Sequence, residues 1–96
     1  MDGLLIEYEY EGDEAAWSET IQSFLRAIAA DARAAGRFRY HVFVKPDGKS
    51  RAHVPSWDSP ETLAHVQAQD YFKTFAAAVQ KAAGGTLKTT KVKFAG

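Results

Sequence analysis

Residues 37–57, RFRYHVFVKPDGKSRAHVPSW, decide the fold of this chain. From residue 37 to residue 45 apolar side chains alternate with mostly polar ones, which is the pattern of a half-buried strand. Pro46-Asp47-Gly48 predicts a turn, because proline presets φ and glycine supplies a positive φ. A returning strand follows over residues 50–57. The segment therefore predicts a β-hairpin at the middle of the chain.

A strand and a helix precede this hairpin. Residues 4–11 alternate between apolar and mostly acidic side chains, which predicts a strand. Asp13 is expected to cap the next helix, since its carboxylate can accept backbone N–H groups. Residues 13–35 carry apolar side chains at helical spacing, and we expect the helix to stop at Gly36. The apolar stripe comprises Trp17, Ile21, Phe24, Leu25, Ile28 and Ala32.

A second helix and a last strand follow the hairpin. Ser59-Pro60-Glu61 predicts a helix start, with a hydroxyl cap, proline in the first turn and an acid near the positive end of the dipole. This helix is expected to continue to Gly84-Gly85, and residues 86–95 predict a strand. The element order βαββαβ predicts an α+β, ferredoxin-like fold, in which a four-stranded antiparallel sheet carries two helices on one face.

Charge predicts which strands are neighbours. Residues 1–25 carry seven acids and no base, whereas residues 81–96 carry four lysines and no acid. Lysines on an antiparallel neighbour would offset the repulsion among the glutamates of the first strand by about 0.2–1 kcal/mol per pair. The first and last strands should therefore pair, as in the ferredoxin-like order 4-1-3-2. The pairs expected are Lys91 and Lys93 against Glu7, Glu9 and Glu11, with a bulge near Thr89.

Composition restricts the function classes. The 96 residues are 46% apolar and 25% charged, which predicts one globular domain over residues 1–96. Twelve bases balance twelve acids, so no overall attraction to nucleic acid or to an anionic membrane is expected. Absence of cysteine excludes disulfides, thiolate catalysis and sulfur-based zinc sites. No apolar run approaches a membrane span and no signal peptide leads the chain, so a cytoplasmic location is expected.

The sheet face away from the helices is expected to be an interface. Strand alternation, combined with a three-residue hairpin loop, would place large aromatic and charged side chains on it. No segment of the chain remains to cover this face, and exposed aromatic patches favour self-association. A homodimer through the sheet face is therefore predicted. The residues expected on this face are Leu5, Glu7, Glu9, Arg39, His41, Phe43, Arg51, His53 and Trp57.

Residues 57–65, WDSPETLAH, and residues 70–75, DYFKTF, resemble the antibiotic biosynthesis monooxygenase-like (ABM) domains of the dimeric α/β-barrel superfamily. The shared features are a tryptophan that ends the third strand, the s-x-e-x-l helix start, a histidine and an aromatic-rich second helix. The resemblance implies a homodimer with a cavity between the sheet and the helices of each subunit. It also implies cofactor-free oxygenation of phenols or quinols. Haem degradation, which relies on an asparagine in the first strand, is not expected, because this chain contains no asparagine.

Histidine and tyrosine supply the candidate site residues. His65 lies on the core-facing stripe of the second helix and is the candidate catalytic base, because histidine titrates near neutral pH. Its alternative role is structural, with hydrogen bonds to the backbone. Helix-facing tyrosines suit an aromatic ligand, although their hydroxyls could instead reach solvent, and Trp57 could line the cavity or the dimer seam. The candidate ligand-binding residues are Tyr8, Tyr10, Tyr40, Trp57, Phe72 and Phe75.

His41 and His53 are candidate metal ligands. With a three-residue hairpin loop, Lys45 pairs with Lys49 and the two histidines lie opposite each other on the outer face. A carboxylate of the first strand would complete a set suited to iron or zinc. A solvated or interface-bridging pair is the alternative, and no resident metal or cofactor is expected.

Three functions remain open at this level. The first is a small homodimeric ABM-like domain that binds a phenol or quinol and acts as a cofactor-free monooxygenase, with His65 orienting or deprotonating the substrate. The second is a non-catalytic ligand-binding or dimerisation domain of the same fold. The third is a metal-dependent enzyme that uses His41 and His53. A closed apolar cavity reached by His65 would favour the first.

Overall fold

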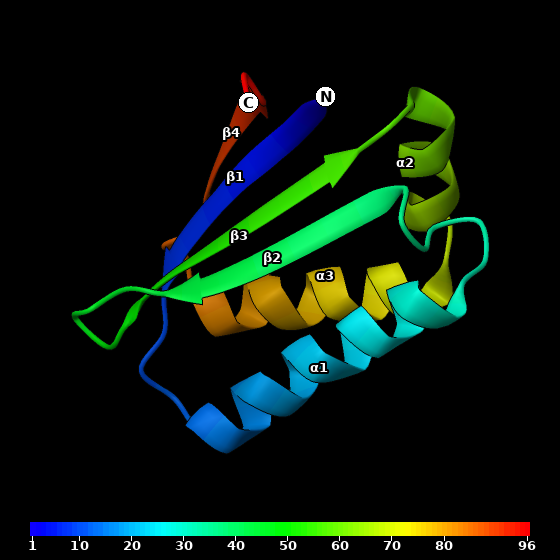
Figure 1. Ribbon diagram of the computed structural model, residues 1–96. Helices are drawn as coiled ribbons and strands as arrows, with labels where there is room; N and C mark the ends of the chain where they lie inside the picture. The colour runs from blue at the N-terminus through cyan, green and yellow to red at the C-terminus, as the bar shows by residue number, and fades with distance from the viewer.

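A four-stranded antiparallel sheet forms one layer of the molecule and the helices form the other, in a computed structural model that describes residues 1–96 (Figure 1). This is the predicted α+β, ferredoxin-like fold, with the second helix divided in two. The elements are β1 (Asp2–Glu9), α1 (Glu14–Ala30), β2 (Phe38–Val44), β3 (Ser50–Trp57), α2 (Pro60–Gln67), α3 (Asp70–Ala83) and β4 (Lys88–Lys93). No helix is both long and apolar enough to cross a membrane.

The strand order is β2-β3-β1-β4, so the first and last strands pair as their charges predicted. The individual partners differ from the prediction. Lys88, rather than Lys91 or Lys93, lies opposite Glu7, and the Glu7 carboxylate forms its ion pair with Lys45, at 3.1 Å. The register between β1 and β4 is constant along the whole ladder, so the bulge expected near Thr89 is absent.

The hairpin loop holds four residues, 46–49, and not the expected three. Lys45 donates its backbone N–H to the carbonyl of Ser50, and the Asp47 carboxylate accepts the backbone N–H groups of Lys49 and Ser50. Val42 therefore lies opposite His53. A shift of one residue in register moves every side chain of a strand to the other face of the sheet.

This shift corrects the predicted outer face of the sheet. Arg51, His53 and Trp57 face the helices, because their partners on β1 and β2 do so. The outward residues of β3 are Ala52, Val54 and Ser56 instead. The helix-free face is consequently more apolar than predicted, and Phe43 and Phe94 are 54% and 40% exposed.

The first predicted helix is shorter than expected and the second is interrupted. Asp13 caps α1, as predicted, but the helix ends at Ala30 rather than at residue 35. Asp31 adopts extended backbone, with φ of −92° and ψ of 105°, and its carboxylate accepts hydrogen bonds from outside the helix. The helix capped by Ser59 breaks after Gln67, and Gln69, also extended, precedes α3. Gly84, in left-handed backbone, ends α3 as predicted.

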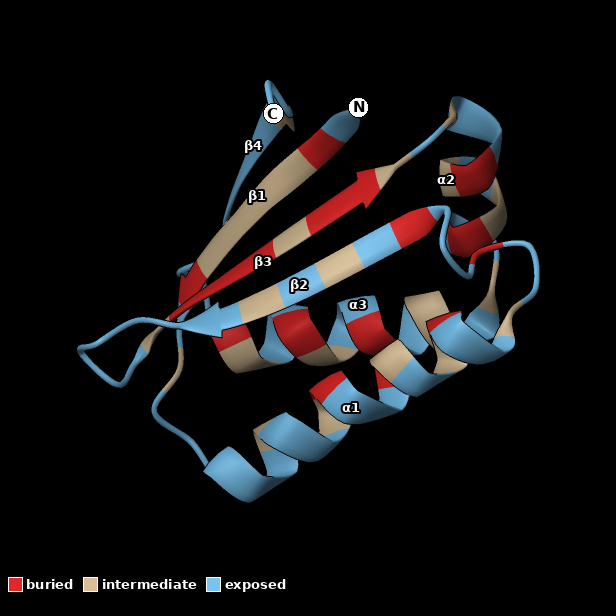
Figure 2. Cartoon of the chain, in the orientation of Figure 1, coloured by how far each residue is buried: buried red, intermediate tan, exposed pale blue.

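The core lies between the inner face of the sheet and the helices, where Figure 2 places most of the buried segments of α1 and α3. Aromatic rings form its centre. Phe24 of α1 stacks on Phe75 of α3, with ring centroids 3.9 Å apart, and Tyr40 of β2 meets both rings edge-on. This aromatic centre fixes the helices against the strands that carry the candidate site.

Candidate functional site

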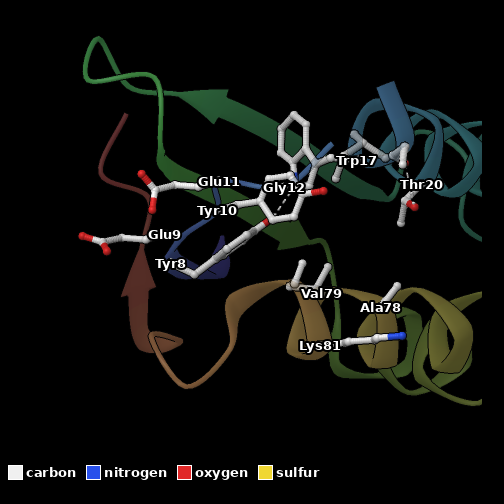
Figure 3. A pocket seen from close by; sticks show the side chains of 13 residues that line it. Tyr8, Glu9, Tyr10, Glu11, Gly12, Trp17, Thr20, Ala78, Val79 and Lys81 are labelled. Atoms are coloured by element: carbon white, nitrogen blue, oxygen red, sulfur yellow. Dashed lines mark hydrogen bonds between the residues drawn. The ribbon is translucent and has the colours of Figure 1, made fainter. Parts of the chain in front are cut away.

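Two cavities on the helix side of the sheet together include all six predicted ligand-binding residues in their walls. The first, here the Tyr10 cavity, has a volume of about 620 Å³ and lies between the end of β1, the start of α1 and the last turns of α3. Figure 3 shows Tyr8, Tyr10 and Trp17 on one side of it and Val79 of α3 on the other. Charged side chains of Glu9, Glu11 and Lys81 also line it, so this cavity is open and mixed in character.

The second, here the Trp57 cavity, has a volume of about 140 Å³ and lies between the sheet and helices α2 and α3. Its walls are mostly apolar. Tyr40, Gln67 and Thr89 contribute polar side-chain groups to its lining, and Trp57 adds its indole N–H. The remaining lining residues are Leu4, Ile6, Phe38, Pro55, Leu63, Phe72, Phe75, Ala76, Val79 and Leu87.

The Trp57 cavity adjoins a larger surface cleft, here the Lys93 cleft, of about 710 Å³. The two share Leu4, Trp57, Leu63 and Gln67 as lining residues. Lys91 and Lys93 of β4 flank the cleft, and neither lysine forms an ion pair. Asp2 also lines the cleft, so an apolar chamber for about one aromatic ring opens into a wider region in which two cations face one carboxylate.

The structure distributes the predicted ligand-binding residues between these cavities. Tyr8 and Tyr10 line the Tyr10 cavity, whereas Tyr40, Trp57, Phe72 and Phe75 line the Trp57 cavity. Trp57 packs on Phe38 with centroids 6.4 Å apart, and so lies on the cavity side rather than at the outer face. The single pocket expected from the sequence is thus two cavities.

His53 lies between the two groups of tyrosines and connects them. Its Nε2 is 2.7 Å from the Tyr8 hydroxyl, and its Nδ1 is 2.7 Å from the Tyr40 hydroxyl. The indole N–H of Trp17 donates to the Tyr8 hydroxyl over 2.8 Å. Phe75 stacks against the imidazole, with centroids 5.9 Å apart. His53 is fully buried, so the middle of this polar chain lies inside the core, whereas Tyr8 and Tyr40 on either side of it line the two cavities.

Burial sets the protonation of this chain of groups. It lowers the pKa of His53 to about 4, because the imidazolium would lose its hydration, and His53 is therefore neutral near pH 7. Burial also raises the pKa of Tyr40, and it raises the pKa of Tyr8 against the opposing effect of the Trp17 hydrogen bond. Both phenols are protonated at neutral pH. The three groups can therefore exchange hydrogen bonds without carrying charge.

Arg51 is a second buried polar residue behind the Tyr10 cavity. Its guanidinium forms a salt bridge with Glu14 in the first turn of α1 and donates to the carbonyls of Tyr10 and Gly48. The guanidinium carbon lies 4.4 Å from the ring centroid of Trp17. The hydrogen bond from Arg51 lowers the pKa of Glu14. Arg51 thus holds Trp17 and the start of α1 in place.

His65, the candidate catalytic base, lines none of these three cavities. Its Nε2 lies 2.7 Å from a carboxylate oxygen of Asp31, and the Tyr71 hydroxyl donates to the same oxygen over 2.8 Å. Burial alone would raise the pKa of Asp31, but the hydrogen bonds from Tyr71 and His65 outweigh it and lower that pKa. The cluster joins the end of α1 to α2 and α3.

The predicted metal pair is wrong. His41 lies opposite Val54 on the outer face, whereas His53 lies on the inner face, so the two imidazoles are on opposite sides of the sheet. No group of three potential ligands among histidine, aspartate and glutamate residues comes together anywhere in the chain. The correction follows from the hairpin register, on which the pair depended.

Sequence reasoning missed His53, Arg51 and Trp17 as parts of the inner site. One signal was available for His53. Buried tyrosine hydroxyls need hydrogen-bond partners, so inward-facing Tyr8 and Tyr40 require a polar residue on the strand between them. That strand is β3, where His53 is the inward residue nearest to both.

Several solved structures have a fold similar to that of this chain. SnoaB from Streptomyces nogalater, a cofactor-independent oxygenase, superposes with a TM-score of 0.75 at 14% identity, over 99% of this chain and 93% of SnoaB. A candidate antibiotic biosynthesis monooxygenase from Nitrosomonas europaea gives 0.78 at 11% identity over 100% of both chains. A third, from Caulobacter crescentus, gives 0.74 at 16% identity over 99% of this chain and 90% of the other. No protein-family profile and no curated protein matches the sequence. The chain therefore has the ABM-like fold.

Proposed function

We propose that this chain binds a small phenol or quinol in the Trp57 cavity and oxidises it as a cofactor-free monooxygenase. One observation carries the proposal: a chamber of about 140 Å³ whose walls include Trp57, Phe72 and Phe75 also presents the hydroxyl-bearing ring of Tyr40. Apolar walls with few polar groups are typical of sites for small aromatic ligands. A cavity of about 150 Å³ is known to hold one benzene-sized guest.

The Trp57 cavity suits such a ligand better than the Tyr10 cavity does. In the larger Tyr10 cavity the carboxylates of Glu9 and Glu11 outnumber the single cation of Lys81, so the net negative charge there would repel a phenolate. The Trp57 cavity opens instead toward Lys91 and Lys93 through the Lys93 cleft, where these two cations outnumber the carboxylate of Asp2 and would favour an anionic phenolate. Similarity in fold to the cofactor-independent oxygenase SnoaB adds support for the oxygenase reaction.

The atoms of the proposed reaction balance with O₂ as the only co-substrate. A phenol with a free ring position and one O₂ give a quinone and one water, so one oxygen atom enters the ring and the other leaves as water. His65 reaches none of the cavities and is therefore given no part in this reaction, so the chain would contribute binding, exclusion of water and orientation of the phenolic oxygen. A non-catalytic binding domain of the same fold would bind the phenol and leave O₂ unconsumed.

Oxygen uptake with resorcinol, a one-ring phenol with free ring positions, together with calorimetric titration of the same compound, tests this function. Ala76→Leu narrows the Trp57 cavity, and Ala82→Leu, on the same helix, narrows only the Tyr10 cavity. We expect Ala76→Leu to weaken binding about tenfold or more, equivalent to about 1.4 kcal/mol, and Ala82→Leu to leave it unchanged. The reverse ranking would place the ligand in the Tyr10 cavity and contradict the proposal. Binding without oxygen uptake would leave the non-catalytic reading.

We further propose that two copies associate through the outer face of the sheet. No helix covers this face, and its partly or largely exposed residues include Leu5, Phe43, Val54, Val92 and Phe94 (Figures 1 and 2). The ring of Phe94 lies over Gly3, where a Cβ would come within 2.8 Å of it. A broad apolar face with charged residues at its margins is typical of an interface between identical subunits.

A further inference from the structure

The hydrogen-bonded chain Trp17–Tyr8–His53–Tyr40 has one more donor hydrogen than it forms hydrogen bonds. Trp17 can only donate, and it donates to Tyr8. A neutral imidazole offers one N–H donor and one acceptor nitrogen, so one tyrosine donates to His53 and the other accepts from it. The accepting tyrosine keeps its own hydroxyl hydrogen. Neither hydroxyl has any other acceptor in the structure, so one phenolic hydrogen is left without a partner.

The tautomer of His53 decides where this spare hydrogen lies. With the hydrogen on Nε2, Tyr8 accepts from both Trp17 and His53 and must direct its own hydrogen toward the Tyr10 cavity. With the hydrogen on Nδ1, every donor points the same way, from Trp17 through Tyr8 and His53 to Tyr40. Chains of hydrogen bonds aligned head to tail polarise and strengthen one another. The second arrangement leaves the spare hydrogen on Tyr40.

The two ends of this hydrogen-bonded chain lie in the walls of different cavities. Tyr8 lines the Tyr10 cavity and Tyr40 lines the Trp57 cavity, with Val79 in the wall of both. His53 itself lines neither and is fully buried. A ligand in the Trp57 cavity that offers an acceptor atom to Tyr40 would take up the spare hydrogen and complete the aligned arrangement.

We propose that Tyr40 is the specificity-determining hydrogen-bond donor of the Trp57 cavity, and that a ligand oxygen there fixes His53 in its Nδ1–H tautomer. The ligand class is a one-ring aromatic compound that bears a carbonyl or phenolate oxygen. This inference rests on the proposed function, since it requires an aromatic ligand in the Trp57 cavity. It assigns Trp17, Tyr8 and His53 as positioning residues that act through Tyr40.

A matched pair of ligands tests the inference. Acetophenone carries a carbonyl acceptor, and α-methylstyrene has nearly the same shape with no acceptor. In protein labelled with ¹⁵N-histidine, two-bond ¹H–¹⁵N NMR spectra distinguish the tautomers of His53. We expect acetophenone to produce the Nδ1–H pattern and to bind several-fold more tightly than α-methylstyrene, as a hydrogen bond of about 1 kcal/mol allows.

The variant Tyr40→Phe provides a second test of the same inference. It should remove the preference for acetophenone and leave α-methylstyrene binding unchanged, whereas Tyr71→Phe, at a tyrosine outside both the hydrogen-bonded chain and the Trp57 cavity, should preserve both affinities. An Nε2–H pattern with acetophenone bound, or equal preference in wild type and Tyr40→Phe, overturns the inference and leaves aromatic binding intact. If neither compound binds, the proposed function itself fails. The wild-type NMR measurement decides the tautomer even if Tyr40→Phe does not fold.

Discussion

His53 is an imidazole that the fold holds neutral between two phenols. In the unfolded chain it titrates near its ordinary pKa of 6.5, and in the folded protein burial lowers that pKa to about 4. Between these two values the unfolded state binds more protons than the folded state, so acid favours unfolding. The stabilising contribution of neutral His53 is complete above pH 6.5 and is lost as the pH falls toward 4.

His53→Gln should therefore flatten the pH dependence of stability. The shift corresponds to about 3 kcal/mol of the free energy of unfolding between neutral pH and about pH 4. Urea denaturation followed by tryptophan fluorescence, near pH 7 and about pH 5, should detect about 2 kcal/mol of this difference. His41→Gln, at an exposed histidine on the outer face, should keep the wild-type dependence. Equal acid sensitivity of His53→Gln and wild type would show that another group carries the effect.

Helix α1 ends at Ala30 because the side chain of the next residue, Asp31, is hydrogen-bonded to residues outside the helix. The Asp31 carboxylate accepts hydrogen bonds from Tyr71 of α3 and from the backbone N–H of Arg33, and it meets His65 of α2. These contacts join three helices at one end of the molecule. The helical pattern of the sequence continues past this point, but a local pattern does not register bonds formed with residues 34 and 40 positions away.

Asp31→Asn should lower the free energy of unfolding by about 1–3 kcal/mol, because it weakens a partly buried, charge-assisted hydrogen-bond cluster. Asp70→Asn, at an exposed acid in the first turn of α3, is the matched control and should have a smaller effect. Thermal and urea denaturation measure both. Similar losses in the two variants would indicate that the Asp31 cluster does not hold the helices together.

His65→Gln separates a structural role from a catalytic one at the same cluster. Because His65 lines none of the cavities described, we expect lower stability with unchanged affinity for acetophenone. Loss of oxygen uptake with resorcinol at unchanged affinity and stability would instead support a catalytic histidine at position 65.

At the scale of the whole molecule, the open face of the sheet is the surface that a second copy would cover. Phe43 points to this face and is 54% exposed, whereas its neighbour Val44 is 48% exposed and points to the helix side. Phe43→Glu should shift a dimer to monomer, and Val44→Glu should leave it intact. Sedimentation velocity at several concentrations measures the change. A wild-type monomer, or a dimer that survives Phe43→Glu, would contradict association through this face.

Local sequence determined most of the architecture. Hydrophobic periodicity located the four strands and the helical regions, and Asp13, Ser59 and Gly84 act at helix ends as their side chains or backbone freedom predict. Opposite charges at the two ends of the chain indicated the pairing of the first and last strands. These features depend on interactions within a few residues or on pairing of whole segments, and both can be recognised in a linear pattern.

The composition of the site was decided only by the tertiary structure. One extra residue in the hairpin loop turned His53 and Arg51 inward and separated His53 from His41, because side chains on a strand alternate with a period of two. The loop length depends on how the Asp47 carboxylate binds Lys49 and Ser50 and on pairing along the whole hairpin. The division into two cavities likewise follows from how α3 packs against α1 and the sheet, a long-range arrangement that no local pattern of residues encodes.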